Sequence, residues 1–305
     1  MKPEPRNQTT TTADVYSRIT ERIIADLAQG VRPWLKPWSA QESGHLITRP
    51  LRYNGDPYKG VNVLLLWGAA TDKGFSSPFW MTYKQAQELG GQVRKGETGS
   101  LVVYANRFTK TETNEEGEDI EREIPFLKGY TVFNTEQIDG LPERFQPAPL
   151  PSPAPELLHQ AAESFFASTG ASFRHGGNRA FYTTAGDFIQ MPPPQAFKDP
   201  ESYAAIKAHE LIHWTGHSSR MAREFGKRFG DNAYAFEELV AELGAAFLCA
   251  DLQLTPEPRP DHAAYLASWL KVLRQDKRAI FAAAAHAQRA ADYLHGLQAS
   301  EKVAA

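Results

Sequence analysis

Residues 208–217 read AHELIHWTGH, a stretch with two histidines four positions apart and a glutamate directly after the first. The helical pattern around it begins at Asp199, which is followed by proline, and stops at the glycine of this stretch. On a helix, His209 and His213 fall on one face and can reach the same metal ion, while Glu210 can act on a water molecule at that ion. The stretch therefore predicts a metal site with Glu210 as general base.

The third protein ligand must come from another segment, because a catalytic zinc takes three protein ligands and keeps one position for water. Residues 234–250, YAFEELVAELGAAFLCA, predict a second helix with Glu238 and Glu242 one turn apart beside a strip of alanines. Burying two carboxylates beside an apolar strip costs free energy unless they have charged or hydrogen-bonding partners. We expect Glu238 to bind the metal and Glu242 to accept a hydrogen bond from a ligand histidine. Two alternatives for the third ligand remain: His217, and Glu237 if the helix is rotated by one residue.

These parts indicate hydrolysis of a peptide bond in a protein substrate. The expected ion is Zn²⁺, with Mn²⁺ or Co²⁺ also compatible, because such an ion polarises a carbonyl and makes its water more acidic. Glu210 would take the proton of that water. Residues 180–192, AFYTTAGDFIQMP, predict an edge strand along which an extended substrate can align. His217, Arg220 and Tyr234 are equivalent candidates for contacting the substrate or the oxyanion.

The composition favours two domains. The chain has 305 residues, of which 42% are hydrophobic, enough for two ordinary cores. Residues 142–156, PERFQPAPLPSPAPE, contain six prolines and almost no core-forming residues. We therefore expect an α+β protein with domains at 13–141 and 156–305, each with its own core, joined by a proline-rich linker at 142–155.

Cysteine content and hydropathy limit the cellular compartments that the sequence fits. Cys249 is the single cysteine, so no internal disulfide can form and a reducing compartment fits. The longest apolar run, at 61–70, is too short to cross a bilayer. We expect a cytoplasmic protein without a membrane partner.

The first domain shows a mixed helix and strand pattern. Asp14 can cap a helix, because apolar residues at helical spacing follow it as far as Gly30. Residues 61–67, VNVLLLW, are expected to be a strand or another buried segment. The acidic run at 111–123 lies between two expected strands and is interpreted as a long hairpin tip.

Charge is unevenly distributed in this domain. Residues 1–110 carry 15 Lys and Arg against 9 Asp and Glu, while residues 111–123 carry 7 acids against 1 base. Basic and aromatic residues interleave in the first segment, a mixture that is typical of single-stranded nucleic-acid binding, although Trp and Tyr are more often core residues. The candidate DNA contacts are Arg32, Trp34, Lys36, Trp38, Arg52, Tyr53, Asn54, Tyr58, Lys59, Asn62, Trp80, Thr82 and Lys84.

Several longer stretches resemble a known family. VYSRITERII, YNGDPYKGVN, FWMTYKQAQELGGQVRKGETG and FNTEQIDGLP are similar to the N-terminal domain of the plasmid-borne ArdC antirestriction proteins, and to the leading part of some plasmid primases. HELIHWTGH followed by residues 234–250 resembles the second half of that family, so the similarity covers about 14–298. The Glu238 and Glu242 helix is also similar to the gluzincin peptidase helix whose first acid binds zinc and whose second supports a histidine.

The resemblance implies a single-stranded DNA-binding domain joined to a zincin-like metallopeptidase domain, which together protect incoming plasmid DNA from host restriction during conjugation. Two other interpretations stay open. In one, the protein shields DNA and its metal is only structural. In the other, the first domain of a metallopeptidase binds a protein.

Overall fold

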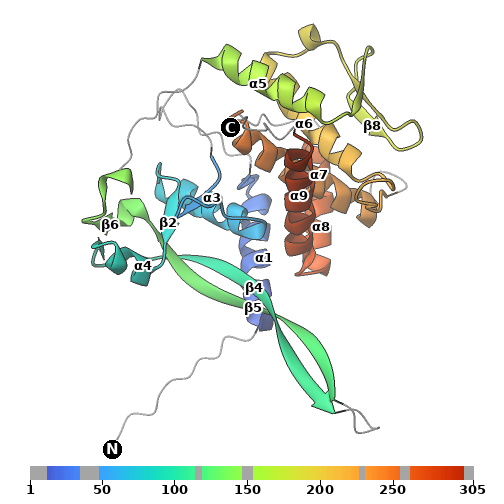
Figure 1. The fold of residues 1–305 in the computed structure, drawn as a ribbon. Coiled ribbons are helices and arrows are strands. Elements are labelled where there is room, and N and C mark those ends of the chain that lie inside the picture. Colours follow the sequence, from blue (N-terminus) through green and yellow to red (C-terminus); the bar gives the residue numbers. More distant parts are fainter. Residues whose placement is uncertain are drawn as a thin grey trace, which may run out of the picture.

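The computed structural model describes six ranges of the chain, 12–34, 48–113, 119–145, 154–226, 231–254 and 262–298. Within them the chain folds as an α+β protein in two halves that lie against each other (Figure 1). Lys36, Trp38 and most of the expected linker lie outside the described residues. Among the described helices, none is both long enough and apolar enough to cross a membrane.

The first half is built on a four-stranded sheet in the order β1-β2-β5-β4. Its strands are β1 (Leu51–Arg52), β2 (Phe79–Met81), β4 (Ser100–Thr113) and β5 (Asp119–Asn134). β1 and β2 are parallel, and the other neighbouring pairs are antiparallel. β4 and β5 project from the body as a long two-stranded arm (Figure 1). The expected hairpin is thus confirmed, and its strands extend into the acidic run on both sides of residues 114–118.

Three helices of the described part accompany this sheet, α1 (Thr12–Ala28), α3 (Val61–Lys73) and α4 (Tyr83–Glu88). α1 buries Val15, Ile19, Ile23 and Leu27, the apolar series that predicted it. It begins before Asp14, so that residue lies inside the helix rather than at its cap. α4 begins with a capping box, in which the side chains of Thr82 and Gln85 each accept a hydrogen bond from the other residue's backbone N–H.

The expectation of a strand at 61–67 is wrong, although most of the segment is buried as expected. A short apolar run buried on several sides has no period that separates strand from helix. The first turn of α3 lies where a further strand would otherwise pair with β4. Asn62 donates to the Val103 carbonyl and accepts from the Val103 N–H, both at 2.8 Å, which satisfies two backbone groups on the edge of β4.

In the residues that the structure describes, the second half combines five helices with a small sheet. The helices are α5 (Pro155–Ser168), α6 (Pro200–Thr215), α7 (Asn232–Asp251), α8 (His262–Gln275) and α9 (Ala279–Gly296). The strands are β7 (Ser172–His175), β8 (Phe181–Thr183) and β9 (Phe188–Met191), in the order β7-β9-β8. β8 is therefore an edge strand, as expected from the sequence, and it contacts α6.

α6 and α7 pack closely because a glycine lies at their contact. A Cβ atom at Gly244 would lie 2.9 Å from three side-chain carbons of Ile212, which is closer than real Cβ contacts. Ala208 on α6 and Ala241 on α7 are both fully buried. The two helices that carry the candidate metal ligands are therefore held at short range.

A single cluster of buried apolar residues extends through both halves. At the boundary, the ring of Trp34 meets that of Trp269 with centroids 6.1 Å apart, and Trp67 meets Phe247 at 6.0 Å. The expectation of a separate core for each domain is therefore wrong. A smaller cluster in the first half packs around α4 and the paired strands β3 (Gln92–Val93) and β6 (Ile138–Asp139).

A buried arginine also joins the halves. Arg49 donates to both carboxylate oxygens of Asp251, at the end of α7, at 2.7 Å. It also donates to Gln288 of α9 at 2.6 Å, and its guanidinium lies 4.7 Å from the ring centroid of Phe247. Planar, bidentate pairing of this kind is the strong form of a charged hydrogen bond.

We predict that Arg49→Ala lowers the free energy of unfolding by about 3 kcal/mol, because it leaves the Asp251 carboxylate without its buried partner. Arg22→Ala is the matched control, since the pair of Arg22 with Asp72 is half exposed and contributes less than about 1 kcal/mol. Urea denaturation followed by circular dichroism measures both variants. Equal losses would show that Arg49 does not stabilise the contact between the halves.

Candidate metal centre

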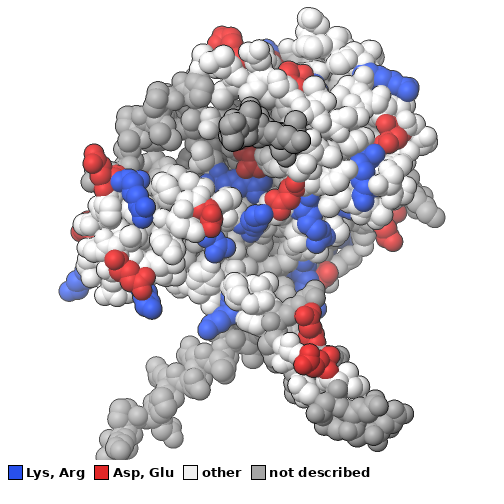
Figure 2. Space-filling view, viewed as in Figure 1, with Lys and Arg blue, Asp and Glu red and all other residues white. Residues whose placement is uncertain are grey.

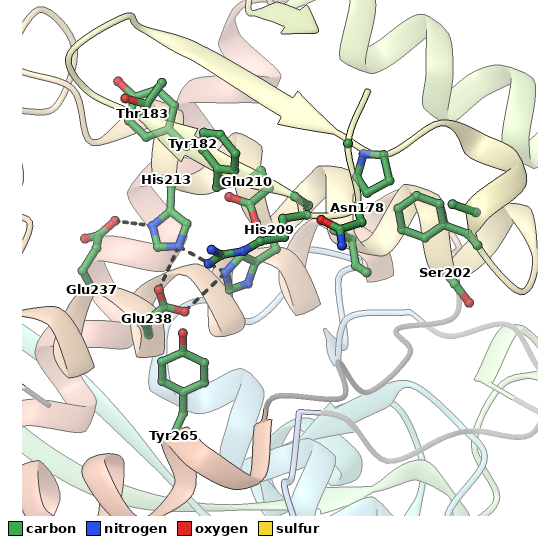
Figure 3. Close-up of a pocket in the computed structure, with 18 of the residues that line it drawn as sticks. Asn178, Tyr182, Thr183, Ser202, His209, Glu210, His213, Glu237, Glu238 and Tyr265 are labelled. Atoms are coloured by element: carbon green, nitrogen blue, oxygen red, sulfur yellow. Dashed lines mark hydrogen bonds and ion pairs between the residues drawn. The ribbon is translucent and has the colours of Figure 1, made fainter. Parts of the chain in front are cut away.

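The start of α6 fixes which residues face the interior. Asp199 accepts a hydrogen bond from the Ser202 N–H at 2.7 Å, and proline follows it at the first helical position, as the sequence predicts. His209, Glu210 and His213 are then buried in the last two turns. All three line one cavity, together with Glu238 of α7 (Figure 3).

The three expected ligands come together at one point. The Nε2 atoms of His209 and His213 lie 3.1 Å apart. One carboxylate oxygen of Glu238 lies 3.6 Å from Nε2 of His209, and the other lies 3.6 Å from Nε2 of His213. Atoms held about 2.1 Å from one tetrahedral ion lie roughly 3.4 Å from each other, so these separations fit a single divalent cation.

The outer nitrogens of the histidines meet two more carboxylates. Nδ1 of His213 lies 3.1 Å from Glu237, and Nδ1 of His209 lies 3.5 Å from Glu242. The partner at Nδ1 sets which ring nitrogen is free to bind a metal. Glu237, considered as an alternative ligand, is thus placed behind His213. Glu242 lies behind His209, but at this separation the expected hydrogen bond to Nδ1 of His209 is not formed.

Arg223 holds Glu237 in this position. Its guanidinium donates to both oxygens of Glu237, at 2.9 and 2.8 Å. It also donates to the hydroxyl of Thr215 at 2.8 Å and to the carbonyl of Ile212 at 2.7 Å, which ties it to the end of α6. Burial disfavours the Glu237 carboxylate, but Arg223 and His213 outweigh it and lower the pKa of Glu237.

The same carboxylates affect His213. Burial disfavours its charged form, yet the hydrogen bonds and charges of Glu237 and Glu238 raise the pKa of His213 to about 10. Burial also disfavours the charged form of Glu238, and the two histidines lower its pKa. A divalent cation that binds here below this pH therefore displaces a proton from the imidazole.

The cavity around the site has a volume of about 1000 Å³. Edge strand β8 forms one wall with Phe181, Tyr182 and Thr183. Tyr234 and Tyr265 form part of the opposite wall, with their hydroxyls 3.1 Å apart. Burial, Tyr265 and the charge of Glu238 raise the pKa of Tyr234, so its phenol keeps its proton near neutral pH.

The structure distinguishes the three residues that were equivalent candidates for contacting the substrate. Tyr234 lines the cavity, whereas His217 and Arg220 do not. Nδ1 of His217 lies 2.7 Å from the hydroxyl of Ser219. Arg220 donates to the carboxylate of Asp187 and to the carbonyl of Trp214, so its guanidinium ties the loop after α6 to the turn between β8 and β9.

The described candidates for DNA contact differ in exposure. Trp34, Tyr58, Asn62 and Trp80 are buried, so the structure does not offer these side chains to a base. Arg52, Tyr53, Asn54, Lys59 and Lys84 are exposed, while Arg32 and Thr82 are half-buried. Thr82 caps α4, and Lys59 pairs with Asp292 of α9.

Comparison with known proteins gives the family. Residues 13–133 match the model of the N-terminal domain of the anti-restriction factor ArdC, and residues 160–286 match a zincin-like metallopeptidase model. The metal-free crystal structure of the ArdC protein from plasmid R388 is 48% identical, with a TM-score of 0.77, and the match covers 93% of this chain and 97% of that one. The chain belongs to the ArdC antirestriction family.

Other ArdC-like matches cover most of the chain. The Mn(II)-bound R388 structure is 46% identical, with a TM-score of 0.76, over 95% of this chain and 100% of that one. The uncharacterized protein y4eC of Sinorhizobium fredii is 43% identical over 94% of both chains. Two Escherichia coli proteins named DNA primase TraC are 38% and 37% identical over 92% and 90% of this chain, which spans only 27% and 19% of their lengths.

Sequence reasoning missed Arg223 and Tyr265. Arg223 lies in the segment between α6 and α7, where no helical period indicates its direction. Tyr265 comes from α8, 27 residues after Glu238, and it reaches the cavity only because of the tertiary packing of that helix. No local pattern marks either residue.

We predict that Glu238→Ala and His209→Ala abolish the binding of one equivalent of added divalent metal, because each deletes one of three convergent ligand atoms. His217→Ala is the control and keeps the metal. Elemental analysis after dialysis against metal-free buffer measures the content. Loss of metal in His217→Ala with retention in Glu238→Ala would reverse the ligand assignment.

We predict that Glu237→Ala weakens metal affinity by about 10- to 100-fold and keeps one site at saturating metal, because Glu237 orients His213. Glu201→Ala is the control, since this half-buried acid in the first turn of α6 does not line the cavity. Competition with a chromogenic chelator measures the affinity. An unchanged affinity would show that His213 is oriented without Glu237.

Proposed function

We propose that this chain protects incoming plasmid DNA from host restriction during conjugation, and that it acts in the cytoplasm. In this proposal its first half binds single-stranded DNA and its second half hydrolyses peptide bonds with zinc. The observation that carries the hydrolytic part is the meeting of His209, His213 and Glu238 in a cavity that also contains Glu210 and an edge strand.

The cavity supplies the groups that peptide hydrolysis needs. A divalent cation bound there would polarise a carbonyl and lower the pKa of its water. Glu210 directly follows His209 on α6 and lines the cavity, so its carboxylate takes the proton of the attacking water and passes it to the leaving amine. The protonated phenol of Tyr234 donates a hydrogen bond to the developing oxyanion.

The edge of the small sheet orients the substrate. Within the described ranges, β8 pairs with β9 on one side only, so its other edge offers backbone groups to an extended peptide. Its residues line the cavity directly beside the histidines. An extended chain that adds to β8 would therefore carry one of its peptide bonds past Glu210.

The choice of zinc rests on the donor set. Two histidines and one glutamate with an open position are typical of catalytic zinc sites. The R388 protein is known in an Mn(II)-bound form, and these donors also suit Mn²⁺ or Co²⁺. The metal that supports activity is therefore tested by reconstituting the metal-free protein with each ion in turn.

Two other functions fit parts of the structure. In the first, the protein only shields DNA and the metal holds α6 to α7, which the buried position of the ligands favours. In the second, the first half binds a protein, which the burial of several aromatic rings first expected to contact DNA favours.

We predict that Glu210→Gln keeps the bound metal and abolishes protection of transferred plasmid DNA, because the amide cannot take the proton. Cleavage of a peptide substrate should fall by about 100- to 10,000-fold. Glu156→Gln, at an exposed acid of α5, is the control. The measurement is conjugation efficiency into recipients with and without a restriction system. Full protection by Glu210→Gln would favour shielding over hydrolysis.

A further inference from the structure

The projecting arm has two chemically different sides. Paired residues of an antiparallel ladder share a side, and successive pairs alternate. One side carries Tyr104 paired with Lys128, and then Asn106 paired with Phe126. The other side carries Thr109 paired with Glu123, and then Thr111 paired with Glu121. We call the side with Tyr104, Asn106, Phe126, Lys128 and Tyr130 the aromatic face.

The aromatic face is accessible to large partners. The side chain of Tyr104 is 49% exposed, a high value for an aromatic ring, and Lys128 is exposed beside it. The ring of Tyr104 lies 6.2 Å from that of Phe126, and Asn106 donates a hydrogen bond to its hydroxyl. This ring is thus oriented by its neighbours while half of its surface remains open.

The aromatic face continues onto the body of the first half. Tyr130 lies next to the Tyr104 and Lys128 pair on the same side of the ladder, and it forms a hydrogen bond with Tyr58. The guanidinium of exposed Arg52 lies 5.0 Å from the ring centroid of Tyr58. A row of rings therefore extends from the sheet along the arm, with Arg52 at its start and Lys128 beside Tyr104 within it.

The opposite side of the arm carries two acidic residues, opposite Thr109 and Thr111. Glu121 and Glu123 are both exposed there. Acidic residues gather near the tip of the arm in the view of Figure 2, while Lys and Arg gather across the body above it. Because carboxylates repel phosphates, a nucleic acid would be directed to the aromatic face rather than to this side.

We propose that the aromatic face of the arm, together with Arg52, is the surface on which single-stranded DNA binds. The rings of Tyr104 and Phe126 stack on bases, and Lys128 and Arg52 contact phosphates. This placement rests on the proposed DNA-binding function. It replaces the buried rings of Trp34 and Trp80 with the exposed ring of Tyr104 and the half-buried ring of Phe126, which sequence reasoning did not select.

A DNA strand fits this surface better than a folded protein does. Rings with open faces and flanking cations suit an irregular polyanion, because every base has a stacking face and every nucleotide carries a charge. A stable protein partner would instead require a broad apolar centre with few charges. The aromatic face is one narrow row with Lys128 and Arg52 as its cations, which matches a single strand.

The test is binding of a fluorescein-labelled oligo(dT) to the full chain by fluorescence anisotropy, over a series of salt concentrations. Tyr104→Ala should weaken binding by about 5- to 150-fold, the loss of one stacked base. Lys128→Gln should also weaken it and reduce the slope of log K against log salt by about 0.7, since one phosphate contact is lost.

Two control variants accompany them. Thr109→Ala changes the acidic side of the same hairpin, and Lys271→Gln removes an exposed cation from α8 in the second half. Both should bind as the unchanged chain does. Circular dichroism and the midpoint of thermal unfolding confirm that Tyr104→Ala and Lys128→Gln remain folded.

The outcomes distinguish an error in the location of the DNA-binding surface from an error in the proposed DNA-binding function. If the unchanged chain does not bind oligo(dT) at low salt, DNA binding itself is wrong and the placement falls with it. If the chain binds but Tyr104→Ala and Lys128→Gln bind equally well, the placement alone is overturned. A change in self-association without a change in DNA binding would show that the aromatic face is instead a contact between two copies of the chain.

Discussion

The metal centre depends on the close approach of α6 to α7. Gly244 permits this approach, because a side chain there would collide with Ile212. Each helix contributes ligands that the other lacks, with two histidines on α6 and the carboxylate of Glu238 on α7. The ligand atoms lie within 4.8 Å of one another only because the backbones are this close. A wider helix pair would leave Glu238 buried and without its partners, which is energetically costly.

Charge balance explains why the centre suits a divalent cation. Four glutamates are buried around the two histidines, namely Glu210, Glu237, Glu238 and Glu242. Arg223 neutralises one of them, and the half-buried Arg32 from the first half of the chain lies within electrostatic range of Glu242. The remaining negative charge attracts a dication strongly in a region that water reaches poorly. Proton uptake by His213 supplies part of the balance when no metal is bound.

Sequence reasoning found the features that local rules determine. Helix spacing and capping placed His209 and His213 on one face, and the spacing of acids along the next helix selected Glu238 before any contact was known. The incorrect predictions concern segments whose secondary structure or exposure depends on tertiary packing. Residues 61–67 are apolar throughout, so their pattern did not separate strand from helix. The sequence pattern of an aromatic residue near a cation does not show whether the ring is buried, as that of Trp80 is, or exposed, as that of Tyr104 is.

The core that the two halves share has a consequence for how the chain is made. Synthesis proceeds from the N-terminus, so α1 and α3 leave the ribosome long before α7, α8 and α9. Trp34 and Trp67 then have no Trp269 or Phe247 to pack against. The nascent first half keeps an apolar surface until translation is nearly complete, which makes it a substrate for chaperones. For the same reason, gene fragments cut between the two regions would encode pieces prone to aggregation.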